Sequence, residues 1–172
     1  MGAYYTFISS LNYLDFSGEA PFSPEEFLER AAVWLPEKEL AALEDGLAKG
    51  APKIASTYER WEKSFRSAVA TLRAAKLSLD FQPNWLECDF LDGETRQAIQ
   101  ELYKAGDPLK LERGLDAIRF AKLDELSVGH FFDFTIVFCY YRKLKLLWRW
   151  QTLNPEAGAA VVKSCSLPPA EN

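Results

Sequence analysis

The sequence has few of the side chains that most often hold metals or perform catalysis. Its 172 residues include one histidine, His130, and three cysteines, Cys88, Cys139 and Cys165. A structural zinc site needs about four closely grouped cysteine or histidine ligands, and the sequence has no CxxC pair. An odd number of cysteines also fits a secreted disulfide framework poorly, because one thiol is left over. We therefore expect no metal, no cofactor and a reducing, cytoplasmic location.

Signals of enzymatic chemistry and of nucleic-acid binding are missing as well. The sequence contains no GxxxxGK[ST] phosphate loop and no GxSxG nucleophile motif. Cys88 lies between two acidic residues, which disfavour the reactive thiolate form. The chain has 20 Lys+Arg against 25 Asp+Glu, a net charge of −5, whereas DNA-binding domains are usually strongly basic. We expect no catalytic site in this chain and no nucleic-acid partner.

Apolar and aromatic residues are plentiful, at 48% and 14% of the chain. A chain of this length buries about 70% of its unfolded surface and needs no metal or disulfide to fold. Helix signals dominate, so we expect a single all-α domain over 1–172, with an N-terminal helical extension at 1–50, a main helical lobe at 52–165 and a frayed tail at 167–172. Helices are expected at 24–34, 37–48, 52–79, 95–104, 108–126 and 130–152, and a short one after Pro155. Only Tyr4–Ile8 could form a strand.

The expected helix over 52–79 has a clear apolar stripe. Its members alternate four and three residues apart: Ile54, Tyr58, Trp61, Phe65, Ala68, Leu72, Ala75 and Leu79. This spacing is typical of a helix that packs along a neighbour. Charged residues, including Glu59 and Glu62, occupy the other faces and are expected to contact water. With the helix at 130–152, this predicts a compact bundle built on two long antiparallel-type helices.

The segment 131–150 is the most apolar stretch, yet it contains five charged residues. Each charge near the centre of a membrane span costs about 2.5–3.5 kcal/mol, so a buried core helix is favoured over a span. Its predicted buried stripe is Phe134, Val137, Tyr141, Leu144 and Trp148.

The opposite face of this helix is basic. Arg142, Lys145 and Arg149, flanked by Phe138 and Trp150, are typical of a protein interface. Alternatively, acids on the preceding helix could neutralise this face within the chain: Asp116, Asp124 and Glu125.

The segment 104–116 contains a proline, then an acid, then a Leu-Asp pair, at short spacing. Pro108, Glu112, Leu115 and Asp116, followed by a long helix of mixed aromatic, aliphatic and basic residues, resemble the pattern of the C/d subunit family of V-type ATPases. The opening segment 4–11 resembles a small bacterial family of uncharacterised proteins. Members of that family tend to be encoded beside V-type ATPase genes and are described as similar to the C/d subunits.

The resemblance implies a non-catalytic part of an ion-transporting, typically proton-transporting, ATPase. The C/d subunits join the central shaft to the membrane rotor ring, so these two parts are the implied partners, and any association with the membrane is peripheral and through the complex. This chain has material for one helical lobe of such a protein, which implies a reduced subunit, an accessory factor or a homo-oligomer. The alternative is a stand-alone helical interaction or regulatory module with an unrelated partner.

Overall fold

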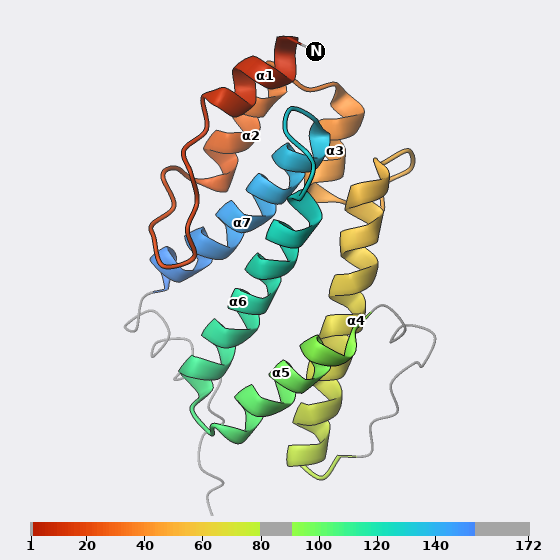
Figure 1. Cartoon of the computed structure of the whole chain (residues 1–172), viewed down its shortest axis with the longest axis vertical. Coiled ribbons are helices and arrows are strands. Elements are labelled where there is room, and N and C mark those ends of the chain that lie inside the picture. Colours follow the sequence, from red (N-terminus) through yellow and green to blue (C-terminus); the bar gives the residue numbers. More distant parts are fainter. Residues whose placement is uncertain (1, 80–90, 154–172) are drawn as a thin grey trace, which may run out of the picture.

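The computed structural model describes residues 2–79 and 91–153, and within these ranges it contains seven α-helices and no strand (Figure 1). The helices are α1 (Gly2–Ser9), α2 (Pro24–Ala32), α3 (Glu37–Glu44), α4 (Lys53–Lys76), α5 (Gly93–Lys104), α6 (Pro108–Ser127) and α7 (Phe134–Thr152). The predicted all-α class is confirmed. The expected short helix after Pro155 and the tail lie outside the described residues.

The segment that could have formed a strand, Tyr4–Ile8, lies within helix α1. Tertiary packing explains the choice, because only Phe7 of this helix is buried and its ring lies 5.6 Å from that of Phe27 on α2. A short helix suffices to present a single buried side chain, whereas an isolated strand would leave its backbone groups without partners.

Aspartate and serine caps fix where most helices begin. Ser23 and Asp107 cap α2 and α6 as predicted. The start expected for α7 at 130 is wrong, because Asp133 accepts a hydrogen bond from the Ile136 amide (3.3 Å) and the helix begins after it. The end expected for α3 at 48 is also wrong, because Asp45 leaves the helical conformation and its side chain accepts the Leu47 amide at 3.0 Å.

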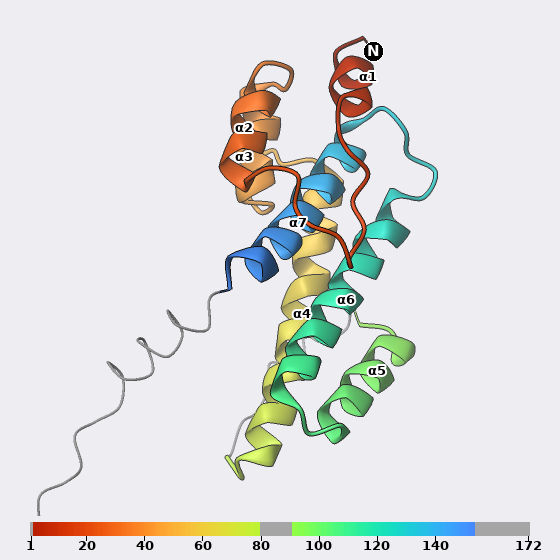
Figure 2. The ribbon, with the colours of Figure 1, turned by 90° about the vertical axis from the view of Figure 1, so that its left-hand side faces the viewer.

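Helix α7 is the centre of the bundle, since it contacts α1, α2, α3, α4 and α6. Figures 1 and 2 show α1–α3 around one end of α7 and α5 at the opposite end of the molecule, where it packs against α4 and α6. The expected antiparallel pairing of the two long helices needs correction. Both α4 and α7 begin at the same end, and α6 runs antiparallel to each of them (Figure 1).

The buried stripes agree with the sequence pattern over most of their length. On α4, Tyr58, Trp61 and Phe65 are buried, but the predicted positions Ala75 and Leu79 are exposed. Val69 and Ala74 are buried instead, and the hydroxyl of Tyr103 on α5 lies at the Val69 carbonyl.

Aromatic rings join α7 to α2 and to α4. Tyr141 lies 5.4 Å from Phe27 on α2, and Phe138 lies 5.8 Å from Tyr58 on α4, between ring centroids. On α7 itself, Leu147 is more deeply buried than the predicted Trp148. In the part of the chain that the structure describes, no helix has both the length and the apolar character needed to cross a membrane.

Replacing each of two tryptophans by alanine should show that one belongs to the core and the other lies at its edge. We expect Trp61→Ala to lower the free energy of unfolding by about 3–5 kcal/mol, because the side chain is 3% exposed and packs on Tyr58 and Phe65. Trp148→Ala should cost clearly less, since Trp148 is only half-buried. Urea denaturation followed by circular dichroism measures both, and equal losses would contradict the assignment of Trp61 to the core.

Candidate functional site

The most unusual feature of the structure is a carboxylate with no access to water. Asp116, on α6, is 0% exposed. Its Oδ1 accepts a hydrogen bond from Arg119 Nη1 (2.9 Å), and its Oδ2 accepts from Arg149 Nη1 (3.0 Å) and from Trp150 Nε1 (2.9 Å). Because Arg149 and Trp150 belong to α7, this one side chain ties the two helices together.

A second buried carboxylate, Glu62 on α4, continues the network. The sequence pattern predicts a water-facing position for Glu62, but it is 5% exposed, so this expectation is wrong. Arg119 Nε lies 3.0 Å from Glu62 Oε2 and 3.1 Å from Oε1, and the Arg119 guanidinium also lies over the Phe65 ring, 4.4 Å from its centroid. Burial alone would lower the pKa of Arg119, but the carboxylates of Glu62 and Asp116 raise it above its ordinary value.

The network extends toward the surface through Glu112, which also lies on α6. One of its carboxylate oxygens accepts from Arg73 Nη2 on α4 (2.6 Å) and the other from Arg149 Nη2 on α7 (3.3 Å). Arg73 Nε in turn donates to the Tyr103 hydroxyl of α5 at 3.0 Å. We call this set the Asp116 network: Glu62, Arg73, Tyr103, Glu112, Asp116, Arg119, Arg149 and Trp150.

The family-like segment therefore has structural roles. Pro108 occupies the first turn of α6, and Leu115 is 1% exposed within the core. Glu112 and Asp116 are two of the three acids that hold the helices together through the network. The sequence singled out both acids but missed Glu62, Arg73 and Arg119. Only the i, i+3 spacing of Asp116 and Arg119 gives a local signal of pairing.

The basic face predicted on α7 is largely neutralised within the chain. Arg142 pairs with Glu59 of α4, and Arg149 pairs with Glu112 and Asp116 of α6. The neighbouring Lys143 pairs with Asp124 of α6. The expected antiparallel partner Glu125 pairs with Lys122 instead. These contacts favour the alternative in which acids on neighbouring helices neutralise this face.

The residues expected to flank this face also differ from the prediction. Phe138 is 0% exposed and belongs to the core, so its expected place at an interface is wrong. The helix turns Phe138 toward Tyr58, and the Arg142 guanidinium covers its ring. Trp150 is half-buried and bonded to Asp116, which leaves Lys145 exposed above the Tyr141 ring and without an ion pair to any residue of 2–79 or 91–153.

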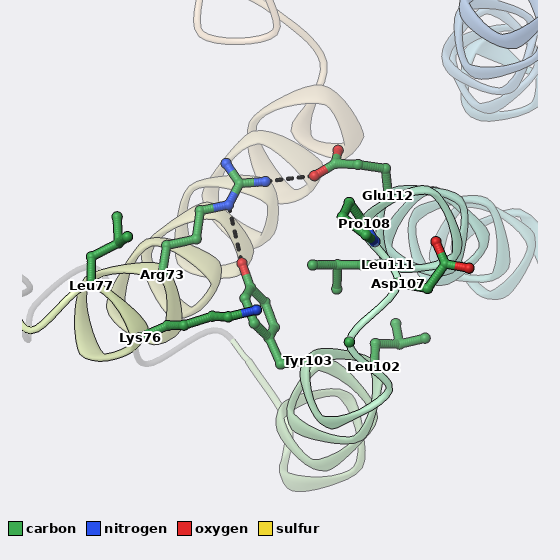
Figure 3. Close-up of a pocket in the computed structure, with 10 residues that line it drawn as sticks. Arg73, Lys76, Leu77, Leu102, Tyr103, Asp107, Pro108, Leu111 and Glu112 are labelled. Carbon is green, nitrogen blue, oxygen red and sulfur yellow. Dashed lines mark hydrogen bonds and ion pairs between the residues drawn. The ribbon is translucent and has the colours of Figure 1, made fainter.

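A pocket of about 300 Å³ opens beside the network, between the end of α4, the end of α5 and the start of α6. Figure 3 shows Arg73 extending over this pocket to Glu112 and Tyr103, with Leu111 directed into the space between the helices. Gly106, at φ 75°, forms the tight turn from α5 to α6. A residue with a Cβ is strained in this conformation, so glycine is required here.

Two of the sparse catalytic candidates, His130 and Cys139, lie within the described residues. His130 Nδ1 lies 2.5 Å from Asp133, the cap of α7, on the connection between α6 and α7. Cys139 is buried, and burial raises the pKa of its thiol to about 12. Cys88 and Cys165 lie outside the described residues. Across the described ranges, no three His, Cys, Asp or Glu side chains gather in a way that could hold a metal ion.

Comparison with protein-family models gives one match to this part of the molecule. Residues 89–165 match the model described as "Protein of unknown function (DUF2764)". The matched segment includes α5, α6 and α7, and therefore Asp116 with its partners Arg119, Arg149 and Trp150. The description assigns no function, and no curated protein and no solved structure matches the chain. A relationship to the C/d subunits of V-type ATPases stays a prediction.

Removing the buried carboxylate should be far more costly than removing an exposed one. We expect Asp116→Ala to lower the free energy of unfolding by about 3–5 kcal/mol, because Arg149 loses its shorter ion pair and Trp150 Nε1 loses its acceptor. Asp124→Ala is the matched control on the same helix. Its side chain is 59% exposed and pairs only with Lys143, so the expected loss is about 0–1 kcal/mol. Comparable losses in chemical denaturation would argue against the central role of Asp116.

The buried thiol provides a second test. Alkylation requires the thiolate, and both burial and the raised pKa keep Cys139 protonated at pH 8. We expect iodoacetamide to leave the Cys139 peptide unmodified in the folded protein and to label it completely in urea. Mass spectrometry of tryptic peptides measures this directly, and rapid labelling under native conditions would show that the α7 core opens.

Proposed function

We propose that this protein is a non-catalytic component of a V-type ATPase, a connector of the C/d type between the central shaft and the membrane rotor ring. The observation that carries the proposal is the Asp116 network. Two of its three acids, Glu112 and Asp116, belong to the segment that resembles the C/d subunits, and they bind α6 to α4 and to α7. The family-like residues thus stabilise the arrangement of the long helices.

A connector that transmits force between two partners needs stiffness more than chemistry. Close-packed interiors resist deformation, and buried ion pairs fix the register of the helices that they join. The network links three long helices, and the aromatic contacts of Tyr141 and Phe138 fix α7 against α2 and α4. These features support a body that moves as a unit.

Exposed apolar side chains at opposite ends of the bundle also support a connecting role. At one end, Leu77 caps α4 and Leu109 lies in the first turn of α6, each 66% exposed. At the other end, the connection between α6 and α7 presents Val128 (77% exposed) and Phe131 (72%), beside the ring pair of Tyr5 and Phe132. Figure 1 shows these two places at the two ends of the long axis. Exposed apolar patches commonly mark binding surfaces.

A stand-alone helical interaction or regulatory module is the second candidate, because the same two apolar ends would serve it equally. It is distinguished from the first by the identity of the partners. In both functions the protein acts in the cytoplasm, and in the ATPase it reaches the membrane only through the complex.

Affinity purification from the native cell tests the proposal. We expect the tagged protein to recover shaft and rotor-ring subunits of the V-type ATPase, while the purified chain alone hydrolyses no ATP. Phe131→Asp and Leu77→Asp should each weaken capture of a different ATPase component, because they alter opposite ends. Lys145→Glu, on a face away from both ends, is the control. Recovery of no ATPase component would overturn the proposal and leave the interaction module.

A further inference from the structure

A second hollow lies beside the pocket at the Asp116 network, between α4 and α5. It has a volume of about 340 Å³, includes Leu72 and Lys104, and shares Lys76 and Tyr103 with the first. The two together form what we call the α4–α5–α6 groove. The first hollow has an apolar floor that includes Leu102 and Leu111, and the exposed Leu77 lines its α4 side.

Two lysines give this groove a positive rim. Lys76 and Lys104 are exposed, and neither makes a hydrogen bond or ion pair with a residue of 2–79 or 91–153. The other charged residues that line the groove are already engaged, because Arg73 contacts Glu112 and Tyr103, and Asp107 pairs with Lys110 and caps α6. Within residues 2–79 and 91–153, the groove therefore offers positive charge that no acid pairs with, on a chain whose net charge is −5. Such local charge favours an acidic partner and speeds its encounter.

The walls of the groove favour a helical occupant. All three walls are α-helices, whose backbone donors and acceptors are paired internally except near their ends. An extended peptide would find few backbone partners here, whereas a helix satisfies its own backbone and needs only side-chain contacts. A small anion is disfavoured, because the unpaired lysines lie on the exposed rim and the floor is apolar.

We infer that the α4–α5–α6 groove binds an amphipathic helix of a partner protein, with leucine- or phenylalanine-type residues on its inner face and Asp or Glu opposite Lys76 and Lys104. That the partner is another component of a V-type ATPase rests on the proposed function. The apolar face lies between Leu77, Leu102 and Leu111, and the acidic residues pair with the two lysines.

Site-specific photo-crosslinking tests the inference in the full-length protein. p-Benzoylphenylalanine replaces the exposed Leu77 in the native cell, and a second protein carries it at Lys145 as a control position outside the groove. We expect position 77, and not position 145, to crosslink to a peptide from an ATPase component that has acidic residues beside apolar residues at helical spacing. Mass spectrometry identifies that peptide.

Charge reversal completes the test. Lys76→Glu combined with Lys104→Glu should reduce the crosslink by about tenfold, because like charges then face the acidic helix. The melting temperature should stay unchanged, since neither lysine has a partner among the described residues. Lys145→Glu should leave the yield unchanged.

The remaining outcomes overturn the inference: a crosslink to a second copy of this chain, a crosslink within the chain, no crosslink, or a yield insensitive to the charge reversal. The two proposals fail separately. An acidic amphipathic helix from a protein outside the ATPase would support the groove and refute the proposed function. Capture of ATPase components without a crosslink at position 77 would support the proposed function and refute the helix-binding role of the groove.

Discussion

A carboxylate that is cut off from water must find its hydrogen-bond donors in the protein, and Asp116 imposes this requirement on the whole bundle. Leaving a buried charge without partners costs several kcal/mol, so the arginines and the tryptophan around it have little freedom to move. Since Arg119 also binds Glu62 and Arg149 also binds Glu112, the position of α6 fixes the positions of α4 and α7. Apolar packing alone tolerates rotation of a helix, whereas a shared carboxylate defines both rotation and register.

The same arrangement explains why the surface of α7 differs from its sequence. Arginines on one face of an apolar helix indicate contact with water or with another protein, but here both arginines of α7 pair with acids of α4 and α6. Their charges are used in contacts between helices of the same chain. Among the described residues, Lys76 and Lys104 at the ends of α4 and α5 are lysines without an ion pair that lie beside a hollow. The surface available to a partner therefore consists of side chains that do not take part in the network.

Capping residues and apolar spacing predicted most of the helices. They did not predict which side chains of different helices contact one another. Ser23, Asp107 and the apolar spacing of α4 act within a few residues, so the class of fold and most helices followed from the sequence. Glu62 had a charged helix neighbour and therefore resembled a surface residue, because its main partner Arg119 is 57 positions away. The burial of Phe138 could not be predicted from the sequence either, because it depends on how α7 is rotated against Tyr58 of α4. The groove depends on the angle at which α5 packs against α6, and the spacing of apolar residues within a single helix does not predict that angle.

The central place of α7 has a consequence for how the chain folds during its synthesis. Helices α1, α2 and α3 are made first, yet each of them packs against α7, which is among the last described elements to be made. The ring contacts of Phe27 with Tyr140 and Tyr141 therefore form late, and they have a high sequence separation. Chains with such long-range contacts fold more slowly than those built from local ones. Until α7 has been synthesised, the N-terminal helices lack the surface against which Phe27 packs in the folded protein.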